Sequence, residues 1–134
     1  MLRRTALWLL ALTLIAACTD TTGPDRVTGT WRLQTVNGGT LPFTIPDDNF
    51  DKLEITENVI TIADSGRFTD RSAFRITDGG VVSTDLINAQ GSYTLEGSVV
   101  TLTYDEDGAV FSATVSGNTM TLVDGALTFM YRRD

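Results

Sequence analysis

Residues 109–133 read AVFSATVSGNTMTLVDGALTFMYRR and alternate apolar with polar side chains across two glycine-containing dipeptides. Gly117-Asn118 and Asp124-Gly125 suit two-residue hairpin turns, because glycine, asparagine and aspartate accept positive φ angles. Placing both turns there predicts these cross-strand pairs: Ala113 with Leu122, Val115 with Met120, Leu122 with Leu127, and Met120 with Phe129. These side chains then share one face, since successive residues of a strand point to opposite sides. The stretch therefore predicts a three-stranded antiparallel meander with a continuous apolar face.

A further hairpin is predicted in LEITENVITI, residues 53–62. Glu57-Asn58 is interpreted as its two-residue turn. The predicted pairs are Ile55 with Ile60 and Leu53 with Ile62. All four then lie on one side of the hairpin, whereas a register shifted by one residue would place apolar side chains on both faces.

The period of two continues over the rest of the chain from Val27 onward. The alternating residues are Trp31 with Leu33, Phe68 with Phe74 and Ile76, Tyr93 with Leu95, and Val100 with Leu102 and Tyr104. About nine or ten short strands result, with the turn spacing of an all-β sandwich or barrel. Short connections favour an up-and-down order, and closure removes exposed edges. We predict an antiparallel up-and-down β-barrel of about 8–10 strands, with residues 36–50 as a long loop that folds Phe43 and Ile45 over one end.

Residues 1–17 combine the basic start MLRR with thirteen uncharged residues between Arg4 and Cys18. This layout is typical of a secretory signal peptide. The apolar run is shorter than the roughly 20 residues of a membrane-spanning helix. We therefore predict a signal helix over residues 1–17 that is removed on export.

The residues IAAC at 15–18 resemble the lipobox of bacterial lipoproteins. The resemblance implies that Cys18 is lipidated, becomes the first residue of the mature chain and attaches it to a membrane. Cys18 is the only cysteine, so it cannot form an internal disulfide, and acylation would remove a reactive thiol from an oxidising compartment. Thr19 after the cysteine favours the outer membrane of the bacterial cell envelope. The alternative is an ordinary cleaved signal beside an incidental cysteine.

Residues 18–26 contain Gly23-Pro24 and no hydrophobic periodicity. They predict a flexible tether between the lipid and a single domain at 27–134. Without Arg3 and Arg4, the mature chain has eight basic residues against seventeen acidic ones, a net charge of −9. Nucleic acid is therefore excluded as a partner, because phosphate binding needs a basic footprint.

The sequence contains no histidine, which excludes Ser-His-Asp triads, Cys-His dyads and histidine-bearing zinc sites. It also lacks a Gly-x-Ser-x-Gly stretch and a phosphate-binding glycine loop before a helix. DEDG at 105–108 lacks the spacing and the distal glutamate of an EF-hand, and is interpreted as a solvated turn. We expect a protein that is not an enzyme, with no catalytic residue, metal or cofactor.

GTWRL at 29–33 resembles the Gly-x-Trp motif that opens the first strand of lipocalins. FMYRR at 129–133 resembles their last strand, in which an arginine lies over the tryptophan. The closest resemblance is to small bacterial lipocalin-like domains, which are often lipoproteins. It spans the domain by pattern and implies a lipocalin-like barrel closed by Gly29, Trp31 and an arginine.

The predicted register decides which arginine packs on Trp31. The inward residues of the last strand are Leu127, Phe129 and Tyr131. Arg133 shares their face, whereas Arg132 points outward. A guanidinium over an indole gains about 0.5–2 kcal/mol. We therefore expect Trp31 and Arg133 to close the barrel rather than to contact a ligand.

A barrel of about eight strands is either filled by side chains or holds one small ligand. The possible ligand-lining residues are Phe68, Asp70, Ser72, Phe74 and Phe111. Thr84 and Leu86 are expected to face the same way. Inward polar groups favour an apolar ligand with a polar end. The alternative is that these polar residues lie at the barrel mouth and face water.

Two functions compete at this point, and a third stays open. One is a lipid-anchored envelope carrier of a small apolar ligand. The other is a tethered protein-interaction or inhibitor module with a filled barrel, since some bacterial protease inhibitors are similar small barrels; its protein partner is unknown. A third is an envelope structural or stress protein without a ligand. An enclosed apolar void of several hundred Å³ would favour the carrier, and a filled interior with a protruding 36–50 loop would favour the module.

Overall fold

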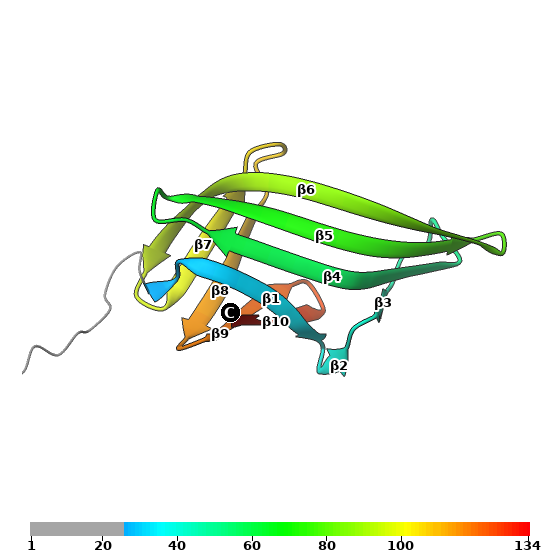
Figure 1. Ribbon diagram of the computed structural model, residues 1–134, viewed down its shortest axis with the longest axis horizontal. Helices are drawn as coiled ribbons and strands as arrows, with labels where there is room; N and C mark the ends of the chain where they lie inside the picture. The colour runs from blue at the N-terminus through cyan, green and yellow to red at the C-terminus, as the bar shows by residue number, and fades with distance from the viewer. Residues whose placement is uncertain (1–25) are drawn as a thin grey trace, which may run out of the picture.

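The computed structural model describes residues 26–134, which form a β-barrel (Figure 1). Its strands are β1 Gly29–Val36, β2 Gly39–Thr40, β3 Phe43–Ile45, β4 Lys52–Ile62, β5 Arg67–Asp78, β6 Val81–Glu96, β7 Val99–Tyr104, β8 Val110–Ser116, β9 Thr119–Asp124 and β10 Leu127–Arg133. The predicted signal peptide, Cys18 and most of the predicted tether lie outside the described residues. No helix in the described part of the chain is long and apolar enough to cross a membrane.

Eight of the strands close into one antiparallel barrel in the order β1-β10-β9-β8-β7-β6-β5-β4, and β1 pairs with β4 to complete it. Trp31 of β1 lies opposite Arg133 of β10 and Ile60 of β4. The all-β up-and-down fold predicted from the sequence is confirmed. The predicted 36–50 loop is partly wrong, because β2 and β3 add short strands to β1 and β4 at one end of the barrel.

The β8–β9 hairpin has the predicted register, with Val115 opposite Met120. The β9–β10 turn is shifted by one residue from the prediction. Asp124 lies opposite Leu127, so Gly125 and Ala126 form the turn. Gly125 has a φ of 57°, and a glycine at the first of two central positions is what a type II′ turn requires. The shift changes the cross-strand partners, but each side chain stays on its predicted face.

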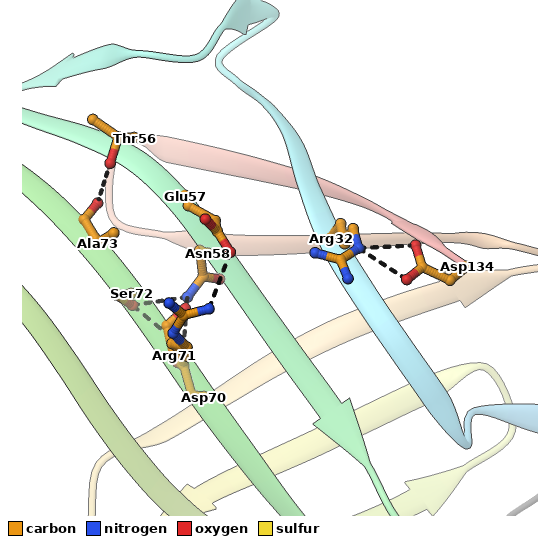
Figure 2. A network of polar contacts seen from close by, with 9 residues as sticks. All are labelled: Arg32, Thr56, Glu57, Asn58, Asp70, Arg71, Ser72, Ala73 and Asp134. Atoms are coloured by element: carbon orange, nitrogen blue, oxygen red, sulfur yellow. Dashed lines mark hydrogen bonds and ion pairs between the residues drawn. The ribbon is translucent and has the colours of Figure 1, made fainter.

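Residues 52–62 form one continuous strand, β4, so the predicted hairpin with its turn at Glu57-Asn58 is wrong. The β4–β5 register shifts between Ile55 and Glu57, which leaves Thr56 as the extra residue of a β-bulge. The Thr56 hydroxyl donates a hydrogen bond to the Ala73 carbonyl oxygen at 3.0 Å (Figure 2). After a one-residue bulge, as after a two-residue turn, the apolar side chains occupy even-numbered positions where odd-numbered ones preceded. Alternation alone therefore could not separate the two.

The β5–β6 hairpin extends beyond the closed part of the barrel (Figure 1). β6 pairs with β7 only from Gly91 onward, so in the described structure no strand pairs with the other edge of 81–89. The apolar side chains exposed on this segment are Val81, Val82, Leu86 and Ile87. The expectation that Thr84 and Leu86 face inward is wrong. They lie opposite Arg75 and Ala73, and β5 residues of this parity point outward.

The core fills the barrel around Trp31. Its fully buried large side chains are Trp31, Phe68, Ile60, Ile62, Leu102, Met120, Val27, Val36, Val100 and Val115. Gly91 is required where β5, β6 and β7 meet. A Cβ there would collide with the Thr103 carbonyl oxygen and the Phe68 ring. The absent side chain lets the Phe68 ring pack against the backbone at Gly91.

Candidate functional site

One end of the barrel is closed by Trp31 and Arg133. The Trp31 side chain is fully buried, and its indole Nε1 donates to the Val27 carbonyl oxygen at 2.8 Å. The Arg133 guanidinium carbon lies 5.0 Å from the centroid of the Trp31 ring, within the range of a cation–π contact. Gly29 has a φ of 130°, and a Cβ there would lie 3.1 Å from Arg133 Cδ. Gly29 thus leaves room for the arginine stem beside the tryptophan.

The Arg133 guanidinium also holds backbone segments together at this end. Its Nη1 donates to the carbonyl oxygens of Arg26 at 2.9 Å and Thr28 at 3.2 Å. Its Nε and Nη2 donate to Asn118 Oδ1 at 3.2 and 3.1 Å. The side chain therefore ties the entrance of β1 to the β8–β9 turn. Arg132 is exposed on the outer face, so Arg133 has the position expected of the closing arginine.

The barrel interior holds a cavity of about 170 Å³, which we call the lumen cavity. Its lining residues are Ile45, Ile55, Asn58, Asp70, Ser72, Phe74, Tyr104, Phe111, Leu122, Asp124, Phe129 and Tyr131. A cavity of about 150 Å³ with apolar walls can hold one benzene molecule. The space therefore suits a single ring or a short chain.

A connected polar network forms one wall of the lumen cavity. The Tyr131 hydroxyl donates to Asn58 Oδ1 at 2.6 Å. Asn58 Nδ2 donates to Asp70 Oδ1 at 2.5 Å and to Ser72 Oγ at 2.8 Å (Figure 2). The Ser72 hydroxyl contacts Asp70 Oδ1 at 3.3 Å, and the Tyr104 hydroxyl donates to Asp70 Oδ2 at 2.5 Å. The hydrogen bonds of this network lead to the Asp70 carboxylate, either directly or through Asn58 and Ser72.

The two tyrosines remain proton donors over a wide pH range. Burial raises the pKa of Tyr131 far above its usual value, and the charge of Asp70 raises it further. Burial raises the pKa of Tyr104 in the same way, with added contributions from the charge of Asp70 and the hydrogen bond to it. A phenolate beside the Asp70 carboxylate would bring two negative charges together with little solvent to separate them.

Four of the five predicted lining residues line the lumen cavity, and Phe68 does not. Asp70 and Ser72 of β5 point inward and belong to the polar network. Phe74 and Phe111 line the apolar side of the lumen cavity. Phe68 does not line it. Its side chain is 1% exposed and packs in the core, behind the cavity-lining Tyr104.

Three polar members of the site were not predicted from the sequence. Tyr131 was expected to point inward only as a bulky side chain, and Tyr104 only to share a face with Val100 and Leu102, because a strand pattern does not show what a buried hydroxyl contacts. Asn58 was placed in a turn, whereas its side chain is 5% exposed inside the barrel. The available signal was the polar residue itself, since an inward asparagine in an apolar strand requires hydrogen-bonding partners.

A second, larger hollow of about 680 Å³ lies on the outer side of the barrel. Its lining residues are Arg32, Val59, Thr61, Thr69, Asp70, Arg71, Asn88, Ala89, Gln90, Asp105 and Glu106. Most of these are polar or charged, and Arg71 and Asp105 already form ion pairs with Glu57 and Arg67. We assign the candidate site to the lumen cavity, because half of its lining residues are apolar, whereas most of those of the outer hollow are polar or charged.

The lumen cavity combines apolar side chains with a connected polar network. Its polar groups already bond to one another, and no buried side-chain nitrogen or oxygen in the described residues lacks a hydrogen-bonding partner. The same residues contain no cluster of three or more metal-ligating side chains. The arrangement can desolvate an apolar group and present an acceptor to its polar end.

Comparison with known proteins agrees with this architecture. A sequence model of the lipocalin-like domain matches residues 27–122, well over half of the chain. A comparison with curated proteins finds no match. The matched span includes Gly29 and Trp31 of the closed end and most strands of the closed barrel. The chain therefore belongs to the family of lipocalin-like domains.

Proposed function

We propose that this protein is a lipid-anchored lipoprotein of the bacterial cell envelope whose barrel carries a small apolar ligand, and that it binds rather than catalyses. The lumen cavity is the observation that supports the carrier role. Phe74, Phe111 and Phe129 give it an apolar lining beside the polar network around Asp70. Ligand sites commonly combine a mainly apolar lining with a few polar groups that fix orientation. At about 170 Å³, the cavity is smaller than the void of several hundred Å³ expected of a carrier, but it accommodates one ring or short chain of a ligand.

Calorimetric titration with benzyl alcohol tests the carrier role. The Phe111→Lys variant should weaken binding on the order of tenfold or more, because it removes apolar wall and its ammonium group can occupy the cavity beside Asp70. Val110→Lys is the matched control, since Val110 is the neighbouring residue and 59% exposed. Both variants are first checked for cooperative unfolding. Absence of binding to the unaltered protein, or equal losses in the two variants, would argue against a ligand site in the lumen.

The anchor is proposed from residues 15–18, whose pattern resembles a lipobox. Two or more acyl chains hold a protein on a bilayer stably, because each buried methylene contributes about 0.8 kcal/mol. Cys18→Ser should release the protein from the membrane fraction and leave it without acyl mass. Thr19 after the cysteine supports the outer membrane as the destination. Unchanged fractionation and unchanged mass in the variant would reject the anchor.

The alternative, a tethered protein-interaction or inhibitor module, is favoured by one observation. The 81–89 segment of β6 has an unpaired edge and exposed apolar side chains, including Leu86 at 49%. Such an edge presents main-chain donors and acceptors that suit an extended segment of a partner protein. Leu86→Lys should then abolish capture of an envelope protein by the barrel, whereas Thr84→Lys on the same face should not. A barrel that excludes benzyl alcohol and shows this difference would replace the carrier proposal.

A further inference from the structure

We infer that the ligand of the lumen cavity is an apolar amine, whose protonated nitrogen pairs with the carboxylate of Asp70. This inference rests on the proposed carrier function and names the chemical class of its ligand. It follows from three observations. Asp70 has no cationic partner in the described residues, one of its acceptor positions is open, and a second carboxylate lines the same cavity.

Asp70 has only neutral partners. Its carboxylate accepts hydrogen bonds from Asn58, Ser72 and Tyr104, and in the described residues no lysine or arginine forms an ion pair with it. The basic residues of β5 point to the outer face and are engaged elsewhere: Arg67 with Asp105, Arg71 with Glu57, and Arg75 with Glu54. Asp70 is partly buried, and burial of a carboxylate is costly without a compensating charge. The described residues supply none.

The hydrogen-bonding capacity of Asp70 is not filled. A carboxylate offers about four lone-pair positions. Oδ1 receives Asn58 and Ser72, whereas Oδ2 receives only the Tyr104 hydroxyl. One position on Oδ2 therefore remains for a donor from the cavity. An ammonium group has three donors and a positive charge, and its hydrogen bond to a carboxylate is of the strong, charge-assisted kind.

The same lining disfavours anionic ligands. Asp70 and Asp124 both line the lumen cavity, and none of its lining residues is lysine or arginine. The carboxylate of a fatty acid would meet two like charges and would find hydroxyl donors already bound to Asp70 and Asn58. Asp124 is exposed, so the repulsion comes mainly from the partly buried Asp70. The cavity should therefore discriminate by charge among molecules of equal size.

The test is a titration of the full chain in lipid nanodiscs, with empty nanodiscs as the blank. The probes are benzylammonium, benzyl alcohol and benzoate, which share one ring and differ in charge. We expect benzylammonium to bind about tenfold more tightly than benzyl alcohol, or better, because both probes can donate a hydrogen bond to Asp70 but only the ammonium adds a charge opposite to that of the carboxylate. Benzoate should bind most weakly.

Two variants test whether Asp70 causes the preference for benzylammonium over benzyl alcohol. Asp70→Asn keeps the size of the side chain and removes its charge, so the advantage of benzylammonium over benzyl alcohol should disappear. Asp105→Asn is the control, because Asp105 is an exposed partner of Arg67 and is not among the lumen-lining residues. If Asp70→Asn does not fold, the order of the affinities of the three probes for the unaltered protein still tests the amine assignment.

The outcomes separate this inference from the carrier proposal. Equal binding of the three probes, or a preference for benzoate, would overturn the amine assignment and leave the carrier intact. A benzylammonium preference that survives in a folded Asp70→Asn variant would also overturn it. No binding of any probe would reject both.

Discussion

At the scale of single residues, the stacked pair of Trp31 and Arg133 has a measurable energetic signature. Trp31→Ala should lower the free energy of unfolding by about 3–5 kcal/mol, because it empties a large buried site. Arg133→Ala should lower it by less. The two losses should not add, since each change removes the same 5.0 Å contact between guanidinium and indole. Denaturant unfolding of the two single variants and the double variant measures the coupling.

Arg32 provides the control for that cycle. It lies on β1 beside Trp31 but is exposed and paired with Asp134 on the outer face. Arg32→Ala combined with Trp31→Ala should therefore give additive losses. Additive losses for Trp31 and Arg133 as well would show that their stacking contributes no free energy of its own.

Tyr131 gives the barrel a pH dependence on the alkaline side. Its pKa in the folded protein is raised by burial and by the charge of Asp70, whereas in the unfolded chain it loses its proton near about pH 10. Above that pH the folded state binds more protons than the unfolded state. Stability present below about pH 10 should then fall by about 1.4 kcal/mol per pH unit from Tyr131 alone. Tyr104 acts in the same direction.

Urea unfolding at a series of pH values between about 9 and 11 measures this slope. Tyr131→Phe keeps the ring and removes the ionising hydroxyl. The variant should be less stable at neutral pH, because Asn58 Oδ1 loses its donor, but its stability should fall less steeply with rising pH. Parallel curves for the two proteins would contradict the assignment of the alkaline loss to Tyr131.

At the scale of elements, the β4 bulge makes one deletion acceptable and another damaging. Removing Thr56 joins Ile55 to Glu57 and leaves both with their present β5 partners, Phe74 and Ala73. The shortened strand should still fold. Removing Val59 instead shifts the register of the rest of the strand by one residue, so Ile60 and Ile62 turn outward.

The loss for the Val59 deletion is on the order of 1.5–3 kcal/mol for each of the two isoleucines. Thermal unfolding of the two deletion variants compares them directly. Comparable damage from both deletions would contradict the bulge at Thr56.

The bulge also explains how far the fold could be predicted from the sequence. Alternation identified the strand faces, because the side-chain period of two is set by the backbone. It gave the β8–β9 register correctly and kept the right faces in β9–β10 despite the shifted turn. It could not distinguish the Thr56 bulge from a turn at Glu57-Asn58, since both reverse the parity of the positions that follow.

The candidate site was accessible to the same reasoning only in part. Asp70 and Ser72 share the parity of Phe74, and the structure brings all three to the lumen cavity. Phe68 has that parity too but sits deeper, against Gly91. Alternation predicts the face of the strand on which a side chain lies, but not its position along the barrel axis. The outward position of Thr84 follows from the β5–β6 register, which depends on pairing rather than on local pattern.

At the scale of the whole molecule, the barrel has two unlike ends. The end around Trp31 is filled and closed by Arg133, whereas the lumen cavity lies next to Ile45 of β3. β4, β5 and β6 are the longest strands and extend past the others (Figure 1). The described residues thus combine a rigid closed base with an interior space. This arrangement suits a carrier, because side chains that contact the ligand can change without disturbing the packed core at the other end.

The carrier role is tested most directly by native mass spectrometry of the protein extracted from its own envelope. The account predicts a small molecule bound at one per chain. It also predicts that a folded Phe74→Arg variant comes without it, because the guanidinium would fill the lumen cavity and neutralise Asp70. A ligand-free mass for the unaltered protein, or the same bound molecule on the folded variant, would contradict the claim that the barrel interior is a ligand site.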